Sequence, residues 1–414
     1  MPLRDEPCRR FDLLGIRELI VLEKILRDLP KSAPQLHTLC IQLFSGAACF
    51  SIDEDFLYDT ERLQCVELTN CKISWDSQLL TGLTRLTLIN SLKANSSIIQ
   101  VLQALRRMPA LTHLHLYDSI PDDSKGLSTY VDVVDLPCLR ALKISSGIGV
   151  GALPAFLRHI SFAHSTILDL TCQENPSTEN DFSKFLSVLA TKFLSTLVIQ
   201  SLWVGKPNDS DPDIEGLEFY LRTTVLNQDF FTSLPISQSQ LHLVLKWFSS
   251  QSHDYVKTLR SAFDVMNLSF LTQLQILVLD EIDSQTWVET FGKLPLLEQV
   301  CLQGFELQPR PFLEALVYKR EAAEKSKTAY CNVSFPKLRY IHLVGIDFQS
   351  DSPTTLLDAL LDCLMERYER NAEVQVLRLE NCHPLLPDDV ERLKEVVDVI
   401  WDGTSYNADL WYSA

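Results

Sequence analysis

Glycine and alanine positions between residues 147 and 152 form the most suggestive chemical motif in the chain. Gly147, Gly149 and Ala152 match the pattern G-x-G-x-x-A, after an expected strand and before a helical pattern over residues 153–160. Asp169 follows about 20 residues later, where dinucleotide-binding folds place an acidic residue against the ribose. However, the order strand, loop, helix recurs along the whole chain, and no second nucleotide-binding half is found. We therefore expect no bound cofactor.

An acidic stretch resembles the start of a calcium-binding loop. Asp209, Asp211 and Asp213 alternate as the first ligands of such a loop do. Ile214 stands where the loop requires a glycine, and Tyr220 stands where it requires a bidentate glutamate. We interpret the stretch as an acidic surface loop without calcium.

Two histidines are spaced so that both imidazoles could reach one metal ion. His113 and His115 lie two residues apart on the same side of an expected strand. Their expected neighbours on the adjacent strands are Arg85, Thr87, Ala141 and Lys143. None of these is a good third ligand, and two carry positive charge. The adjacent Cys382 and His383 also lack further ligands. We expect no metal site and assign the two histidines to contact with a partner or to exposure.

The charge balance argues against nucleic acid as a partner. The chain of 414 residues has 37 Lys and Arg against 54 Asp and Glu, a net charge of −17. Binding to a phosphate backbone needs a positive footprint, and no long basic run is present. The chain also lacks the sequence motifs of serine hydrolases, zinc proteases, P-loop proteins and kinases. We therefore expect neither nucleic-acid binding nor an enzyme.

Cysteine usage and the N-terminal residues indicate the compartment. The 11 cysteines occur singly, without C-x-x-C, as free thiols do in a reducing environment. Residues 1–10 are polar and charged, unlike a signal peptide, and no apolar run reaches the roughly 18 residues of a membrane span. We expect a cytoplasmic or nuclear protein that does not contact membranes.

A short sequence motif, which we call the repeated phrase, recurs along the whole chain. Leu111, Leu114 and Leu116 show the spacing L-x-x-L-x-L, and about thirteen copies with Ile or Val allowed recur, mostly at roughly 20–29 residues. The last residues of each copy alternate between apolar and other side chains, as in a half-buried strand. The further copies are Ile16/Leu19/Val21, Leu36/Leu39/Ile41, Leu63/Val66/Leu68, Leu83/Leu86/Leu88, Leu139/Leu142/Ile144, Leu168/Leu170, Leu194/Leu197/Ile199, Leu241/Leu243, Leu274/Leu277/Leu279, Leu297/Val300/Leu302, Leu338/Ile341/Leu343 and Val374/Leu377/Leu379.

Helical patterns separate the copies. Apolar residues recur at i, i+3 and i+4 over residues 98–107, 182–189 and 356–364. The period predicts an α/β leucine-rich-repeat solenoid, with a curved parallel sheet on the concave face and helices on the convex face. We expect one domain over residues 1–414. Residues 203–235, a polar acidic loop followed by a short helical pattern, and residues 318–331, a charged helix or loop, are expected as insertions within it.

The variable positions between the leucines are the candidate functional residues. They point away from the expected core and mix polar, aromatic and charged side chains, as protein-binding surfaces do. The alternative is that this side of the sheet is only solvated and that loops carry the binding. The candidates are Glu67, His113, His115, Tyr117, Lys143, Asp169, His242, Asp280, Gln303, Tyr340, His342 and Arg378.

Both ends of the chain resemble one family. Residues 9–19 resemble the R-F-x-x-Y-A-x-R-V-R-x-L segment of F-box/leucine-rich-repeat proteins expanded in mushroom-forming fungi, although Leu13, Leu14 and Gly15 depart from its Tyr-Ala part. Residues 386–403 resemble the end of the same proteins, which often close on a helix, a short strand and W-D-G. The repeats themselves resemble those of ribonuclease-inhibitor-like proteins.

The resemblance implies a role in substrate recognition for SCF-type ubiquitin ligases. In the family, a helical F-box precedes the repeats and docks the Skp1 adaptor. Here no recognisable F-box precedes the segment at residues 9–19, and residues 386–390 mimic only its first turn. We therefore expect a monomeric protein-binding scaffold that would engage a Skp1-type adaptor only with an F-box restored. The alternative is a GTPase-activating or other catalytic or regulatory leucine-rich-repeat protein.

Overall fold

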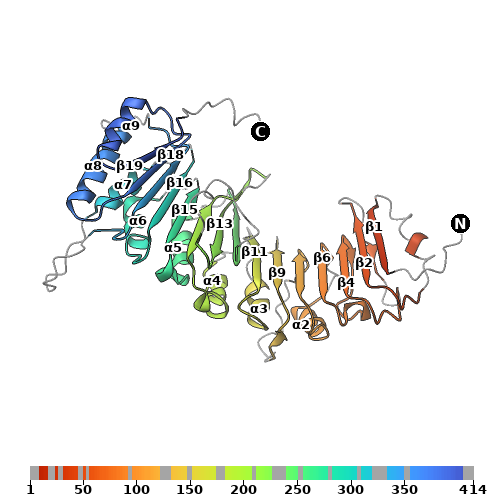
Figure 1. Ribbon diagram of the computed structural model, residues 1–414. Helices are drawn as coiled ribbons and strands as arrows, with labels where there is room; N and C mark the ends of the chain where they lie inside the picture. The colour runs from red at the N-terminus through yellow and green to blue at the C-terminus, as the bar shows by residue number, and fades with distance from the viewer. Residues whose placement is uncertain are drawn as a thin grey trace. The chain divides into compact units, whose positions relative to one another are not determined.

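The chain forms two compact units in a computed structural model. Unit 1 comprises Met1–Thr196 and Gln240–His253, and unit 2 comprises Leu197–Ser239 and Asp254–Ala414. Both are α/β, with mostly parallel strands (Figure 1). The structure describes residues 9–16, 24–26, 31–44, 50–52, 56–91, 96–121, 132–146, 152–173, 182–207, 211–225, 239–249, 255–277, 282–304, 309–318, 333–348 and 355–403.

The strands of unit 1 are parallel and follow one another in a sheet. Each strand pairs with the next across a spacer, as the repeated phrase predicts. In sheet order they are β1 (Arg10–Ile16), β2 (Thr38–Leu43), β4 (Cys65–Thr69), β6 (Arg85–Ile89), β7 (His113–Tyr117), β9 (Ala141–Ser146), β11 (Ile167–Gln173) and β14 (Leu241–Phe248). Two short parallel pairs lie outside this sheet, β3 (Phe50–Ser51) with β5 (Cys71–Lys72) and β8 (Val134–Leu136) with β10 (Ile160–Phe162).

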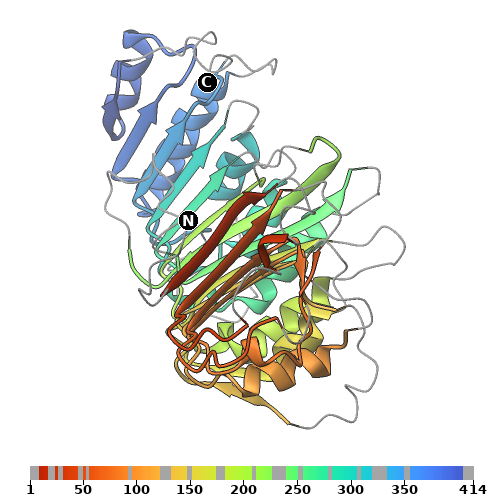
Figure 2. The same cartoon turned by 90° about the vertical axis from the view of Figure 1, so that its right-hand side faces the viewer.

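Helices cover one face of this sheet. They are α2 (Ile98–Arg106), α3 (Ala152–Arg158) and α4 (Phe182–Lys192), all on the same side of the strands in Figure 2. Leu114 and Leu116 are buried on that side, as are the apolar residues of α2. A capping box fixes the start of α2, because the Ser97 hydroxyl accepts from the Gln100 amide and the Gln100 side chain accepts from the Ser97 amide. The predicted helical patterns at 98–107 and 182–189 are thus confirmed as α2 and α4. The pattern at 356–364 is confirmed by α8 (Leu356–Glu369) of unit 2.

Small buried side chains connect successive repeats of unit 1. Ser91 Oγ lies 3.1 Å from the carbonyl oxygen of Leu68, and Ser119 Oγ lies 3.1 Å from that of Leu88. Each serine follows its strand and is buried. A buried carbonyl needs a donor, and these hydroxyls can supply one between repeats.

Unit 2 has the same arrangement with one antiparallel strand. Its strands in sheet order are β13 (Ile214–Arg222), β12 (Ser201–Gly205), β15 (Gln273–Leu277), β16 (Gln299–Gln303), β17 (Tyr340–Val344), β18 (Val376–Glu380) and β19 (Asp398–Trp401). β13 runs antiparallel to β12, and the other pairs are parallel. The helices α5 (Tyr255–Val265), α6 (Ser284–Thr290), α7 (Arg310–Val317) and α8 (Leu356–Glu369) lie along one side of these strands in Figure 1, and α9 (Pro387–Lys394) precedes β19.

The expected insertion at residues 203–235 differs from the structure where it is described. Residues 206–207 and 211–213 lie between two strands, as the expected loop does, but the short helical pattern is replaced by β13, which pairs antiparallel with β12. Leu217, Phe219 and Leu221 are fully buried, and their period of two suits a strand. The ring of Trp203 meets that of Tyr220 edge-on at 5.2 Å between centroids, which links the two strands. The prediction failed because the acidic residues before Ile214 concealed this alternation.

For two copies of the repeated phrase, the strand positions predicted from the sequence differ from those in the structure. Leu194 begins a 3-10 turn, η3 (Leu194–Thr196), and the strand follows at β12, with Leu202 and Val204 buried. Similarly, β15 buries Leu274 and Ile276, which pair with Val300 and Leu302 of β16. In each case a competing leucine pattern lies within a few residues of the actual strand.

At the N-terminus, β1 pairs with β2 and ends at Ile16, the first residue of the first copy of the phrase. Residues 17–21 lie outside the described part of the chain, as do Gly147, Gly149, Asp209, Asp280 and residues 319–331 of the second insertion. No helix in the described ranges is long and apolar enough to cross a membrane.

Candidate functional site

Eight in-register positions form a continuous row on the face of the unit 1 sheet opposite the helices. The register pairs each of them directly with the next, one from every strand. We call them the polar row; its members are Asp12, Cys40, Glu67, Thr87, His115, Lys143, Asp169 and His242. The predicted order of the candidates from Glu67 to His242 is confirmed, as are the lateral neighbours of His113 and His115.

A linked charge cluster occupies one end of the polar row. Asp169 accepts from Lys143 Nζ at 2.7 Å and lies 2.8 Å from His242 Nδ1. Burial disfavours ionisation of Asp169, but the hydrogen bonds from His242 and Lys143 outweigh it and hold the pKa of the carboxyl below its ordinary value. The ionised carboxylate requires a proton on His242 Nδ1 for this bond, so the pair fixes the tautomer of the imidazole. Lys143 keeps half of its side chain exposed.

Next to this cluster, two histidines lie among cationic side chains. Burial, followed by the charge of Lys143, lowers the pKa of His115, and Asp169 opposes that shift. The pKa of His113 is lowered by burial and then by Arg85 and Arg140. Both imidazoles therefore favour the neutral form, which can donate and accept hydrogen bonds at neutral pH.

The strand β7 also carries an exposed aromatic ring. Tyr117 follows His113 and His115 on the same side of the strand and is 41% exposed. Aromatic rings with a polar tip contribute large contact areas to protein interfaces. A polar row with a flanking tyrosine is an arrangement suited to macromolecular contact.

At the other end of the polar row, thiols surround a carboxylate. The Sγ atoms of Cys40 and Cys65 each lie 3.7 Å from Glu67. Burial, with the negative charges of Glu67 and Asp12, raises the pKa of Cys40 to about 11. A thiol with a raised pKa is a poor nucleophile at neutral pH, so this end is suited to binding rather than covalent chemistry.

The corresponding row in unit 2 is mostly buried. His342 is 0% exposed and pairs in register with Cys301 on one side and Arg378 on the other. Tyr340 packs its ring against that of His342 at 6.4 Å between centroids and is itself buried. Large side chains on this face cover one another, so His342 and Tyr340 are not the exposed candidates that the sequence suggested. Arg378 remains partly exposed.

Cys301, His342 and Glu380 stand side by side on β16, β17 and β18. The Cys301 Sγ lies 3.6 Å from His342 Nδ1, and His342 Nε2 lies 3.1 Å from a Glu380 oxygen. These residue types in this order could form a thiol catalytic triad. However, Cys301 is fully buried, and burial raises the pKa of its thiol far above the ordinary value. The arrangement lacks the accessible thiolate that such chemistry needs.

Several positions of the unit 2 row, among them Trp203 and Gln275, are not among the candidates predicted from the sequence. Trp203 and Gln275 pair in register and continue toward Cys301. The copies Ile199/Leu202/Val204 and Leu271/Leu274/Ile276 of the repeated phrase would locate them. The overlapping copies that begin at Leu194 and Leu274 fit the same spacing and lead to the wrong strand positions. Gln303 flanks the row at its expected place on β16, next to Val344.

No group of three or more His, Cys, Asp and Glu side chains in the described ranges is arranged to hold a metal ion. No family model matches the chain, and no curated protein matches it.

Proposed function

We propose that this chain is a leucine-rich-repeat protein whose two units are segments of one solenoid over residues 1–414. The support is the repeated phrase together with the small buried side chains that follow it and link one repeat to the preceding one, which we call the ladder. Ser91, Ser119 and Cys382 each stand three residues after the last leucine of their copy, where leucine-rich repeats place Asn or Cys. Each lies within hydrogen-bond distance of a strand carbonyl of the preceding repeat.

We further propose that the protein recognises a partner protein through the polar row. The observation that carries this proposal is the in-register run of polar and charged side chains from Asp12 to His242, on the face without helices. Lys143, Asp169 and His242 at one end of the row are held in place by an ion pair and a hydrogen bond, and half of the Lys143 side chain remains exposed. Side chains fixed by neighbours lose less conformational entropy on binding than free ones.

The resemblance of both chain ends to F-box/leucine-rich-repeat proteins supports a relation to substrate-recognition subunits of SCF-type ubiquitin ligases. Contact with a Skp1-type adaptor would then require an F-box joined to the repeats. We place the protein in the cytoplasm or nucleus and expect it to act as a monomer. The buried thiol of Cys301 favours a binding protein over an enzyme, and no specific observation favours a GTPase-activating role.

Proximity labelling in cells, followed by mass spectrometry, tests the proposal. The double variant His115→Ala/Lys143→Ala should lose specific partners that the unaltered chain labels. Lys184→Ala on α4 is the matched control, because Lys184 is an exposed lysine on the helical side of unit 1. Retention of every partner by the double variant, with folding verified by circular dichroism, would contradict recognition through the polar row.

A further inference from the structure

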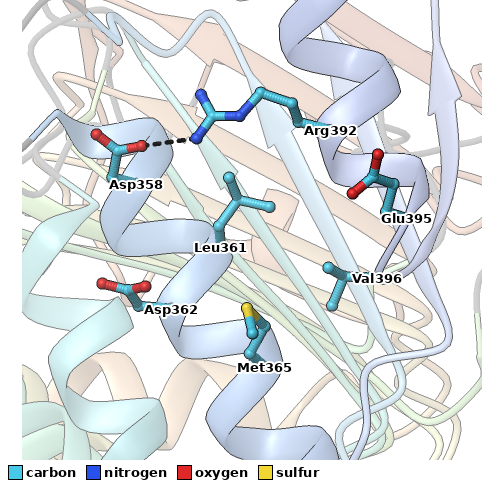
Figure 3. A pocket seen from close by; sticks show the side chains of 7 residues that line it. All are labelled: Asp358, Leu361, Asp362, Met365, Arg392, Glu395 and Val396. Atoms are coloured by element: carbon cyan, nitrogen blue, oxygen red, sulfur yellow. Dashed lines mark hydrogen bonds and ion pairs between the residues drawn. The ribbon is translucent and has the colours of Figure 1, made fainter.

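A surface groove separates α8 from α9 in unit 2. Its volume is about 260 Å³, and Figure 3 shows the side chains of α8, of α9 and of the residues just after α9 that line it. Leu361, Met365 and Val396 supply its apolar part. The charged lining residues are Asp358, Asp362, Arg392 and Glu395. A volume of this size has room for at least one large aliphatic side chain.

The groove arises where the packing of successive helices changes. α7 packs on α6 and α8 packs on α7, whereas α9 packs against β19. The outer flank of α8 therefore keeps an apolar stripe of Leu361, Met365 and Tyr368 at the spacing i, i+4, i+7. Met365 is 51% exposed and Tyr368 is 65% exposed. In the preceding repeats this flank is the surface on which the next helix packs.

The net charge of the residues that line the groove is negative. Three carboxylates and one guanidinium give it a net charge of −2. Arg392 Nη2 donates to Asp358 at 3.0 Å, and hydrogen bonds from Thr355 and Arg392 lower the pKa of Asp358. Asp362 and Glu395 have no ion pair with any residue that the structure describes. Their charges remain available for cations at the two sides of the apolar part.

We propose that this groove binds an amphipathic helix of a partner protein with a basic rim. One bulky aliphatic side chain inserts between Met365 and Val396, and lysine or arginine side chains pair with Asp362 and Glu395. Helices bind grooves in this way through anchors at i, i+3 or i+4 and i+7, the same spacing as the stripe on α8. This surface is separate from the polar row, so the chain would have two interaction sites.

Fluorescence anisotropy with a synthetic peptide tests this site. The probe is a labelled amphipathic helix of roughly 15 residues, with leucines along one face and lysines beside them. The full chain should bind it with a Kd on the order of 10 µM. Met365→Asp should weaken binding about tenfold, since a carboxylate would occupy the apolar part. Asp362→Lys with Glu395→Lys should weaken it similarly and should favour a peptide with glutamates in place of lysines.

Two controls separate this site from general attraction to an acidic protein. Asp264→Lys changes the charge of an exposed residue on α5, outside the groove, and should leave the Kd unchanged. A scrambled peptide of equal charge without an apolar face should not bind. Equal binding of both peptides, equal weakening by Asp264→Lys, or no binding would overturn the proposal. If the chain dimerises and Met365→Asp abolishes the dimer, the groove binds a second copy of the chain. That result would also overturn the proposal.

Discussion

Ser119 Oγ lies 3.1 Å from the carbonyl oxygen of Leu88 in the preceding repeat and 2.8 Å from that of Tyr117 in its own. The side chain is 1% exposed, so water does not replace it as a donor. The hydroxyl therefore links β6 to the turn after β7. In the same turn, Ser119 Oγ accepts from the amide of Ser91 at 3.2 Å, which adds a second connection between the repeats.

Ser119→Ala should destabilise the region around β6 and β7 by about 1–2 kcal/mol, because a buried carbonyl and a buried amide lose their partner. Hydrogen exchange of the amides in β6 and β7 measures this local effect. Ser119→Cys, which keeps a weak donor as Cys382 does in its own repeat, should cost less than alanine. Equal exchange rates in Ser119→Ala and the unaltered chain would show that the ladder contributes nothing to stability.

Leu114 and His115 are neighbours in sequence but point to opposite faces of the sheet. Leu114 is 1% exposed among the helix-side residues, whereas His115 belongs to the polar row. Leu114→Asp should unfold several neighbouring repeats, because it buries a charge without a partner. His115→Ala should leave the thermal stability of the chain nearly unchanged and affect only binding. A comparable drop in melting temperature for both variants would contradict the register.

The register of the regular repeats could be predicted because stacking demands apolar residues at fixed positions. In β7, Leu114 and Leu116 define the strand, and the same spacing holds in β4, β6, β9, β16, β17 and β18. Where two leucine patterns overlap, as at Leu194 and Leu274, spacing alone cannot choose between them. The choice depends on pairing with adjacent strands, such as Leu274 with Val300. Pairing of this kind is a long-range property.

The candidate site could be located by position but not by exposure. The order Glu67, Thr87, His115, Lys143 follows from the period. By contrast, the hydrogen bond between Asp169 and His242 joins residues that are 73 positions apart in the chain. The burial of His342 depends on neighbouring side chains of the same face, including the ring of Tyr340. A repeat pattern assigns a residue to a face of the sheet and carries no information on what else covers that face.

Arg367 of α8 is fully buried and bonds to backbone carbonyls. Its guanidinium donates to Leu316 at 3.1 Å, to Ser334 at 3.0 Å and to Phe335 at 2.9 Å. Burial lowers the pKa of Arg367 to about 10, so the side chain still carries its charge at neutral pH. Arg367 therefore ties α8 to the end of α7 and to the turn before β17.

Arg367→Met should destabilise unit 2 by about 3 kcal/mol, since three buried carbonyl groups lose donors while the side-chain volume is roughly kept. Arg367→Lys should recover only part of the loss, because an ammonium cannot reproduce the planar guanidinium geometry. Hydrogen exchange in α7 and α8 would measure the change. Full stability of the lysine variant would show that charge alone, without the guanidinium geometry, is sufficient at this position.

The stability of unit 2 should fall as the pH is lowered below about 6.5, the ordinary pKa of histidine. Burial is the main cause that lowers the pKa of His342 in the folded chain, and Glu380 opposes the shift. Below that pH the unfolded chain therefore binds a proton that the folded chain resists, so protonation favours unfolding; above it this contribution to stability is fully present. Hydrogen exchange of β16, β17 and β18 at pH 5 and pH 7.5, corrected for intrinsic rates, measures the effect without interference from the histidines of unit 1.

His342→Gln, which cannot titrate, should be less stable overall but should show a smaller difference between the two pH values. An unchanged difference in that variant would assign the pH dependence to another group.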